Sequence, residues 1–228
     1  IAAVLWAARA PIPLALPRTV EDGDSALERP AWSRLLQVAF GAFVLAFIAF
    51  VFWQEDFADH DHSFFTTNTL VGQPIPPPVW PQDGRFWPLG FQEFNVIGRL
   101  STSPPAYHAW PMIQLVILLA GVGRLIRPLR QLVRLGVMLL VLLTPSLAVA
   151  FSGLVYPERN VAFSLVLLLV MVAEWDRAPS RWLLAGIVVV AQFMLYYKEP
   201  VFLLLGVFAA WRVLLKVRAQ PGAGSRAP

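Results

Sequence analysis

The sequence predicts an all-α fold: a polytopic membrane helical bundle of about six transmembrane helices, with a long first external loop bearing short amphipathic helices. Of its 228 residues, 57% are hydrophobic and 14% are charged, and the mean hydropathy is +0.62, whereas a soluble domain has about 25% charged residues. Apolar stretches recur along the chain, and about 20 helical residues cross a hydrocarbon core of about 30 Å. Because a soluble core could not bury all of these stretches, we expect lipid to be the solvent.

The ends and the charge of the chain bound its class further. The chain starts at Ile1, and residues 1–17 lack the basic start and the cleavage site of a signal peptide, so we expect a fragment of a longer protein. The net charge is +4, but the 18 Lys and Arg residues fall mostly in short segments between apolar runs. This pattern indicates topology determinants and no nucleic-acid partner. The absence of cysteine excludes disulfides and thiolate sites.

Six apolar segments are the expected spans: residues 35–53, 109–123, 135–155, 160–173, 182–197 and 201–215. A single helix from Trp182 to Leu215 would be about 51 Å long, far more than the core thickness. Lys198, Glu199 and Pro200 are therefore predicted to form a turn between two spans. The chain then divides into a cytoplasmic or interfacial segment 1–34, a transmembrane domain 35–215 with the external loop 54–108, and a cytoplasmic tail 216–228.

Basic residues fall on alternate connections, which predicts the orientation of the bundle. Arginine and lysine cluster before the first span and after the second, fourth and sixth spans: Arg29, Arg34, Arg124, Arg127, Arg130, Arg134, Arg177, Arg181, Lys216 and Arg218. By the positive-inside rule these connections are cytoplasmic. The loop 54–108 and the turns around Glu158 and Lys198 then face the outside. We expect a multi-pass protein of a bacterial inner membrane with its active side external.

The external loop 54–108 is much longer than the 2 to 8 residues usual between bundle helices, and it is rich in Trp and Phe. This composition argues against a disordered linker. Residues 73–81 read as extended polyproline. Residues 86–100 carry Phe86, Leu89, Phe94, Ile97 and Leu100 at spacings that fit an amphipathic helix on the membrane surface.

The first span runs directly into an acidic segment that could supply a general base. Asp56, Asp59 and Glu55 are the candidate catalytic residues, because a carboxylate that is partly desolvated above the lipid can have its pKa raised toward the working range. The alternative is a solvated acidic loop that only reports topology.

The alternation of acids and imidazoles in the same segment suits a divalent cation. In an extended backbone Asp59 and Asp61 lie on one face, and His60 and His62 on the other. Carboxylate oxygens favour Mg²⁺ or Mn²⁺ and imidazoles favour Zn²⁺. No third ligand is fixed by the spacing, so the metal remains optional and no other cofactor is expected.

Three short motifs could bind substrate on the external side. Residues 83–87 read as a turn that places Arg85 beside Trp87, where an aromatic face suits a sugar ring or a cation and a guanidinium suits phosphate. Anchoring of the loop in the interfacial belt is the alternative. Glu93 could be catalytic or simply polar. Glu158 with Arg159, and Lys198 with Glu199, pair an acid with a base in each turn. Since adjacent residues do not face each other on a helix, we expect each to reach a different partner, with exposed turn charges as the alternative.

A first span closing on Glu55 and Asp56, a long aromatic first external loop, and later turns with Glu158, Arg159, Lys198 and Glu199 together resemble the GT-C membrane glycosyltransferases. The stretch 83–89 is similar to loops in bacterial members. The resemblance covers residues 35–215. It implies a carboxylate base in the first external loop, a polyprenyl-phosphate sugar donor and, in some members, a divalent metal. Family members usually have more than six spans, and the Asp-His-Asp-His run is unusual.

These observations favour a glycosyltransferase of the cell envelope that moves a hexosyl or pentosyl group from a lipid-linked donor to a glycan, lipid or protein acceptor outside the cytoplasm. A transporter or flippase is the alternative, but such proteins place polar residues near the bilayer midplane. Here the spans are nearly free of ionisable groups, with Gln114 and Gln192 as the notable polar residues. A non-catalytic envelope assembly subunit is the third hypothesis.

Overall fold

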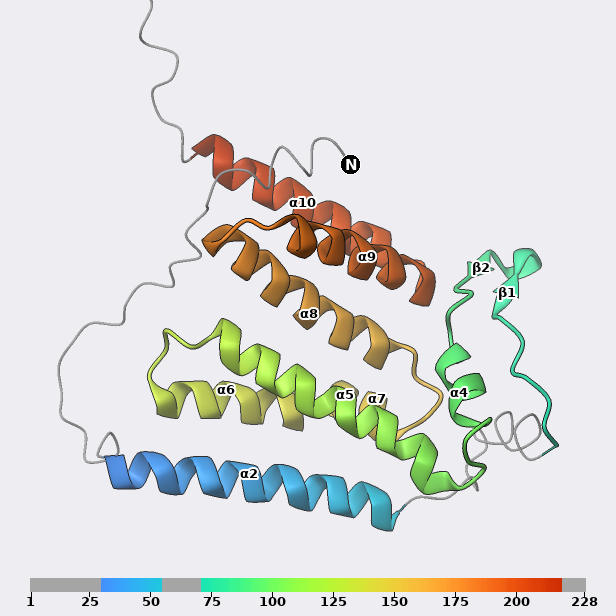
Figure 1. The fold of residues 1–228 in the computed structure, drawn as a ribbon, viewed down its shortest axis with the longest axis horizontal. Helices are drawn as coiled ribbons and strands as arrows, with labels where there is room; N and C mark the ends of the chain where they lie inside the picture. The colour runs from blue at the N-terminus through green and yellow to red at the C-terminus, as the bar shows by residue number, and fades with distance from the viewer. Residues whose placement is uncertain (1–29, 55–70, 219–228) are drawn as a thin grey trace, which may run out of the picture.

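The computed structural model describes residues 30–54 and 71–218, and within them the all-α prediction is confirmed. Five of the six predicted apolar segments are continuously helical, and the longer helices run roughly along one direction of the molecule (Figure 1). The helices are α2 (Pro30–Trp53), α4 (Gln92–Ile97), α5 (Pro104–Leu125), α6 (Gln131–Leu143), α7 (Pro145–Ser152), α8 (Glu158–Arg177), α9 (Arg181–Tyr197) and α10 (Val201–Arg218). Lys198, Glu199 and Pro200 form the predicted turn between α9 and α10.

Two of the described helices are long and apolar enough to cross a membrane, and a third span results if α6 and α7 count as one. The two are Trp32–Trp53 within α2 and the whole of α5, whereas α9 and Val201–Leu215 of α10 are shorter apolar helices. α8 carries charged residues at both ends, which shortens its apolar stretch. The structure thus shows two or three helices that are long and apolar enough to cross a membrane, and the count of six spans stays a prediction.

The third predicted span, residues 135–155, is broken. α6 and α7 meet at an angle of 62°, because Pro145 has no backbone N–H to continue the ladder and disfavours a helical conformation at the residue before it. Thr144 is accordingly extended, with ψ 117°. Its hydroxyl donates a hydrogen bond of 2.8 Å to the carbonyl oxygen of Leu140, which satisfies one of the carbonyls left open at the helix end.

Two buried apolar clusters join the long helices, a third joins the external loop to α5 through Phe94 and Tyr107, and the surface around them is also apolar. One cluster joins α2, α5, α6 and α7, with Leu115 and Phe151 fully buried, and the other joins α8, α9 and α10 around Met194. Large apolar side chains nevertheless point outward, among them Leu45 and Val207, which are 67% and 69% exposed. An exposed apolar surface of this extent is typical of a protein that contacts lipid.

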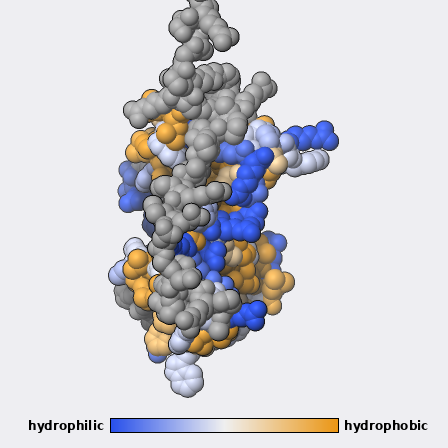
Figure 2. All heavy atoms as spheres, turned by 90° about the vertical axis from the view of Figure 1, so that its left-hand side faces the viewer, coloured by the Kyte–Doolittle hydropathy of each residue, from blue (hydrophilic) through white to orange (hydrophobic). Residues whose placement is uncertain are grey.

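The charges of the helices gather at the two ends of the bundle. At the predicted cytoplasmic end, Glu174 binds Arg124 at 2.9 Å and Arg177 at 2.6 Å, and Arg212 holds Asp176 through two hydrogen bonds of 2.6 and 2.7 Å. Figure 2 looks at this end, where hydrophilic residues in blue gather between hydrophobic ones in orange. The described part of the predicted external loop, which includes α4, lies at the opposite end in Figure 1.

The described part of the external loop folds against the helices. β1 (Val79–Trp80) pairs with β2 (Arg85–Phe86) in an antiparallel hairpin closed by η3 (Pro81–Asp83). Gly84 has φ 64°, so the glycine predicted for this turn supplies the left-handed backbone that it requires. Residues 73–78 have no helix or strand, whereas Val79 and Trp80 form β1 and Pro81 begins η3, so the polyproline stretch predicted for residues 73–81 does not extend past Pro78.

The amphipathic helix predicted for residues 86–100 is wrong in extent and setting. Only α4 is helical, since Phe86 belongs to β2 and Pro88 disfavours a helix through Trp87. Phe91 precedes α4 at φ 65°, a conformation that non-glycine residues adopt rarely and at some cost. Phe94 is fully buried and stacks on Tyr107 at 5.5 Å. α4 therefore packs against the bundle, and Phe94 does not lie on the membrane surface.

Candidate functional site

The site candidate lies where the external loop meets α8 and the turn between α9 and α10. Two hydrogen bonds from backbone N–H groups fix the loop there: Leu89 N donates to the Tyr196 carbonyl oxygen at 3.1 Å, and Phe86 N donates to the side-chain Oε1 of Glu199 at 2.9 Å. The rings of Phe86 and Tyr196 also meet edge to face at 6.3 Å. Segments more than 100 residues apart in the sequence thereby form one surface.

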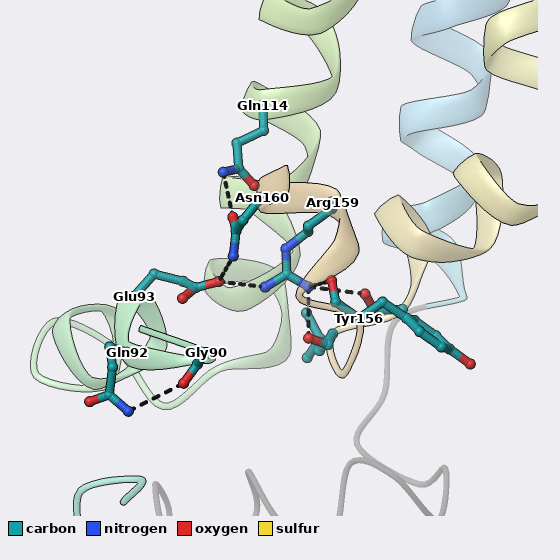
Figure 3. A network of polar contacts seen from close by, with 9 residues as sticks. Gly90, Gln92, Glu93, Gln114, Tyr156, Arg159 and Asn160 are labelled. Atoms are coloured by element: carbon teal, nitrogen blue, oxygen red, sulfur yellow. Dashed lines mark hydrogen bonds and ion pairs between the residues drawn. The ribbon is translucent and has the colours of Figure 1, made fainter. Parts of the chain in front are cut away.

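A buried polar network ties α4 to α5 and α8, as Figure 3 shows. Arg159 Nη2 donates to Glu93 Oε1 at 2.8 Å, and Asn160 Nδ2 donates to the same oxygen at 2.7 Å. Asn160 Oδ1 in turn accepts from Gln114 Nε2 at 2.8 Å. The network begins at the loop carboxylate and ends inside α5.

Arg159 is completely enclosed. Its side chain is 0% exposed, its Nη1 donates to the Leu154 carbonyl oxygen at 2.7 Å, and its guanidinium lies 4.8 Å from the centre of the Phe94 ring. Desolvation by burial lowers the pKa of Arg159, and the charge and hydrogen bond of Glu93 oppose that fall. The two residues therefore depend on each other as a charged pair.

Glu93 places only one of its oxygens in this network. Oε1 accepts from both Arg159 and Asn160, whereas Oε2 is buried and has no hydrogen-bond partner among the described residues. Carboxylate oxygens accept up to about four hydrogen bonds in total. Glu93 consequently keeps acceptor capacity beside the loop.

Lys198 sits in a cage formed by a carboxylate and an indole. Its Nζ lies 3.0 Å from Glu158 Oε1 and 4.7 Å from the centre of the Trp87 ring, and its side chain is 22% exposed. Trp87 is only 8% exposed, and the face of its indole ring contacts the Lys198 ammonium. The carboxylate and the indole thus orient the ammonium at the predicted external end, and the side chain as a whole stays partly exposed.

Glu199 and Arg85 border this cage. The pKa of Glu199 lies below its ordinary value: burial, the largest influence, would raise it, but backbone N–H groups of Glu199 and Phe86 and the charges of Arg85 and Lys198 together outweigh burial. Glu199 is therefore anionic at neutral pH and holds the hairpin through Phe86 N. Arg85 is exposed on β2.

The structure brings most predicted substrate-binding residues into one region. Trp87 and Glu158 form the cage around Lys198, and Glu199 and Arg85 lie beside it. Arg159 belongs to the buried network next to the cage. Glu158 and Arg159 bind different partners, as predicted. With its Nη1 and Nη2 groups bound to backbone carbonyls and to Glu93, Arg159 ties the loop to α8, and its contact with substrate stays a prediction.

The predicted catalytic residues Asp56, Asp59 and Glu55 lie outside the described residues, as do the predicted metal ligands Asp59, His60, Asp61 and His62. Within residues 30–54 and 71–218, no three His, Asp or Glu side chains gather closely enough to hold a metal ion. The acid–base and metal hypotheses therefore rest on the sequence.

The sequence had left the roles of two polar residues open. Gln114 stood out as a polar residue in an apolar segment, and Asn160 follows the charged turn, but neither had a proposed partner. Their signal was their type, because a polar side chain inside an apolar helix needs a hydrogen-bond partner.

Comparison with family models, curated proteins and solved structures finds no match for the chain.

Proposed function

We propose that the protein is a membrane glycosyltransferase that moves a sugar from a lipid-phosphate donor to an acceptor on the non-cytoplasmic face. The observation that carries the proposal is Lys198, a partly exposed cation oriented by Glu158 and Trp87 at the end of the bundle where the external loop docks. A lipid-linked donor presents its phosphate at this depth, and an ammonium suits phosphate as a point charge.

The reaction needs a base, a phosphate ligand and a surface for the sugar. Asp56 or a neighbouring carboxylate takes the proton from the acceptor hydroxyl. The oxygen of that hydroxyl forms a bond to the anomeric carbon of the sugar. The bond from that carbon to the phosphate oxygen breaks, and Lys198 and Arg85 stabilise the charge of the leaving phosphate. Trp80 and Phe86, which are 42% and 53% exposed, offer aromatic faces next to the cage. If a divalent cation is required, it assists the same leaving group.

The proposal includes six spans with the site outside. All connections with arginine clusters lie at one end of the bundle and the hairpin and α4 lie at the other (Figure 1). α9 has 17 residues and is about 25 Å long, somewhat less than the thickness of the hydrocarbon core. The bilayer accommodates such a short span by thinning locally.

This topology predicts the labelling of single cysteines. The chain has no cysteine, so Thr102→Cys and Ala178→Cys each introduce one thiol at an exposed position. In intact cells an impermeant thiol reagent should label position 102 and leave position 178 unlabelled until the membrane is opened. Labelling of position 178 in intact cells, or protection of position 102, would overturn the orientation.

The function predicts that Lys198→Ala raises the donor KM about 10- to 100-fold, because a hydrogen bond to a charged group contributes about 1.5–3 kcal/mol. The thermal stability should change little, since the pair with Glu158 is partly exposed and such pairs contribute about 0–1 kcal/mol. Arg99→Ala is the matched control: it removes an exposed cation from the external loop and leaves Glu158 and Trp87 in place around Lys198, so the donor KM should not rise. A normal donor KM in Lys198→Ala would remove Lys198 from donor binding.

A transporter is the second candidate, and the break between α6 and α7 favours it, because broken helices form the substrate sites of many transporters. The break at Leu143, Thr144 and Pro145 carries no ionisable side chain, whereas the ion pairs gather at the two ends of the bundle. Release of polyprenyl phosphate from the donor supports the transferase, and movement of an intact substrate across the bilayer supports the transporter.

A further inference from the structure

An apolar groove of about 210 Å³ runs between α5 and α8. Its walls include Ile117 and Ala120 from α5 and Val166 and Val170 from α8. Ile117 is 45% exposed and Ala120 is exposed, so the groove opens on the surface of the bundle. The helices touch at its floor, where a Cβ on Gly121 would lie 2.6 Å from Val166 Cγ1. The groove is thus a shaped apolar surface on the outside of the bundle.

Arg124 lines the groove at the cytoplasmic end of α5. Its side chain is 52% exposed, and its Nη2 lies 2.9 Å from Glu174 Oε1. Arg177 Nη1 binds the same oxygen at 2.6 Å. Two guanidinium groups therefore share one carboxylate, and this end of the groove has a net positive charge.

The dimensions of the groove match a lipid chain. From Ile117 to Arg124 the helix rises about 10 Å, which falls within the half-thickness of about 15 Å of the hydrocarbon core. A chain lying along Ile117 and Val170 therefore brings its headgroup to the level of Arg124. Basic pockets between transmembrane helices on the cytoplasmic side are suited to anionic headgroups.

We propose that this groove binds an anionic phospholipid, with an acyl chain between α5 and α8 and the phosphodiester headgroup against Arg124. The site is separate from the proposed transferase site, which lies at the other end of the bundle. Its occupancy depends on headgroup charge and on Arg124, and it does not depend on the reaction that the protein catalyses.

The test compares two photo-reactive positions at the same depth. Ile117, eight residues before Leu125, and Val189, eight residues after Arg181, are each replaced by p-benzoylphenylalanine; both are about half exposed, at 45% and 51%. The protein is reconstituted in equimolar phosphatidylglycerol and phosphatidylcholine with identical chains, irradiated, and its lipid adducts are weighed by mass spectrometry. The ratio of phosphatidylglycerol to phosphatidylcholine adducts should be about fivefold higher at position 117, since a cation near the surface contributes about 1 kcal/mol of attraction to anionic lipid.

Charge variants assign the preference to the groove. Arg124→Gln should bring the adduct ratio at position 117 down to that at position 189, Arg124→Lys should retain it, and Arg181→Gln should leave it unchanged. Equal ratios at both positions, or an equal loss in Arg181→Gln, would overturn the site. Adducts at position 117 formed mainly with a second copy of the chain would also overturn it, because the groove would then be a protein interface.

Discussion

Arg159→Met is expected to lower the free energy of unfolding by about 3–5 kcal/mol, because it leaves Glu93 as an uncompensated buried charge. The side chains of Arg159 and Glu93 are 0% and 11% exposed, and Asn160 alone cannot neutralise the carboxylate. Loss of the guanidinium also removes the hydrogen bond that Arg159 Nη1 donates to the backbone carbonyl oxygen of Leu154. Reversible unfolding in mixed micelles, followed by circular dichroism, measures the change.

Two further variants separate buried charge from lost packing. Glu93→Gln combined with Arg159→Met removes both charges and should recover a large part of the loss, since replacing a whole buried pair is often nearly neutral. Arg124→Gln breaks a more exposed pair, with side chains 52% and 28% exposed, and should change stability by about 0–1 kcal/mol. If Arg159→Met were as mild as Arg124→Gln, the network would not be what fixes α4 to the bundle.

Asp56→Asn is expected to reduce the rate of sugar transfer by about 10²- to 10⁴-fold while the protein stays folded, because the amide keeps the shape of the side chain and removes its basicity. α2 ends at Trp53. Asp56 follows three residues later, directly after Glu55, and so lies close to the end of the first span. Asp59→Asn is the next candidate for the same loss.

The matched control is Asp83→Asn, which removes an exposed acid from the turn of the hairpin in the same loop. It should transfer sugar at the normal rate, and its circular dichroism should match that of Asp56→Asn. Normal transfer by Asp56→Asn would exclude it as the base, and equal losses in Asp56→Asn and Asp83→Asn would point to damage of the loop in general.

The helices could be predicted because their signals are local. Apolar stretches of the expected length are helical, and the turn at Lys198 follows from helix length and Pro200. Pro145 was visible in the sequence as well, but apolar character on both sides of it concealed the bend of 62°. Hydropathy indicates whether a segment lies in lipid or in water, and it does not indicate whether the helix through that segment is continuous.

The docking of the external loop could not be predicted because it depends on contacts between distant segments. Glu93 reaches Arg159 across 66 residues, and Phe86 reaches Glu199 across 113 residues. The spacing of apolar residues in the loop fits both a membrane-surface helix and a helix packed on protein. What followed from the sequence is that adjacent charges bind separate partners, as Glu158 and Arg159 do and as Lys198 and Glu199 do.

Sugar transfer by the purified protein in proteoliposomes tests the central claim most directly. Polyprenyl phosphates carrying radiolabelled hexoses or pentoses are supplied as donors with cell-envelope glycan and lipid as acceptors, and both labelled product and released polyprenyl phosphate are measured. The account predicts that label enters the acceptor with an equal amount of polyprenyl phosphate released, and that Lys198→Ala shifts the donor concentration required. Label that stays on every donor while the protein is folded, or that crosses the bilayer unchanged, would contradict the account.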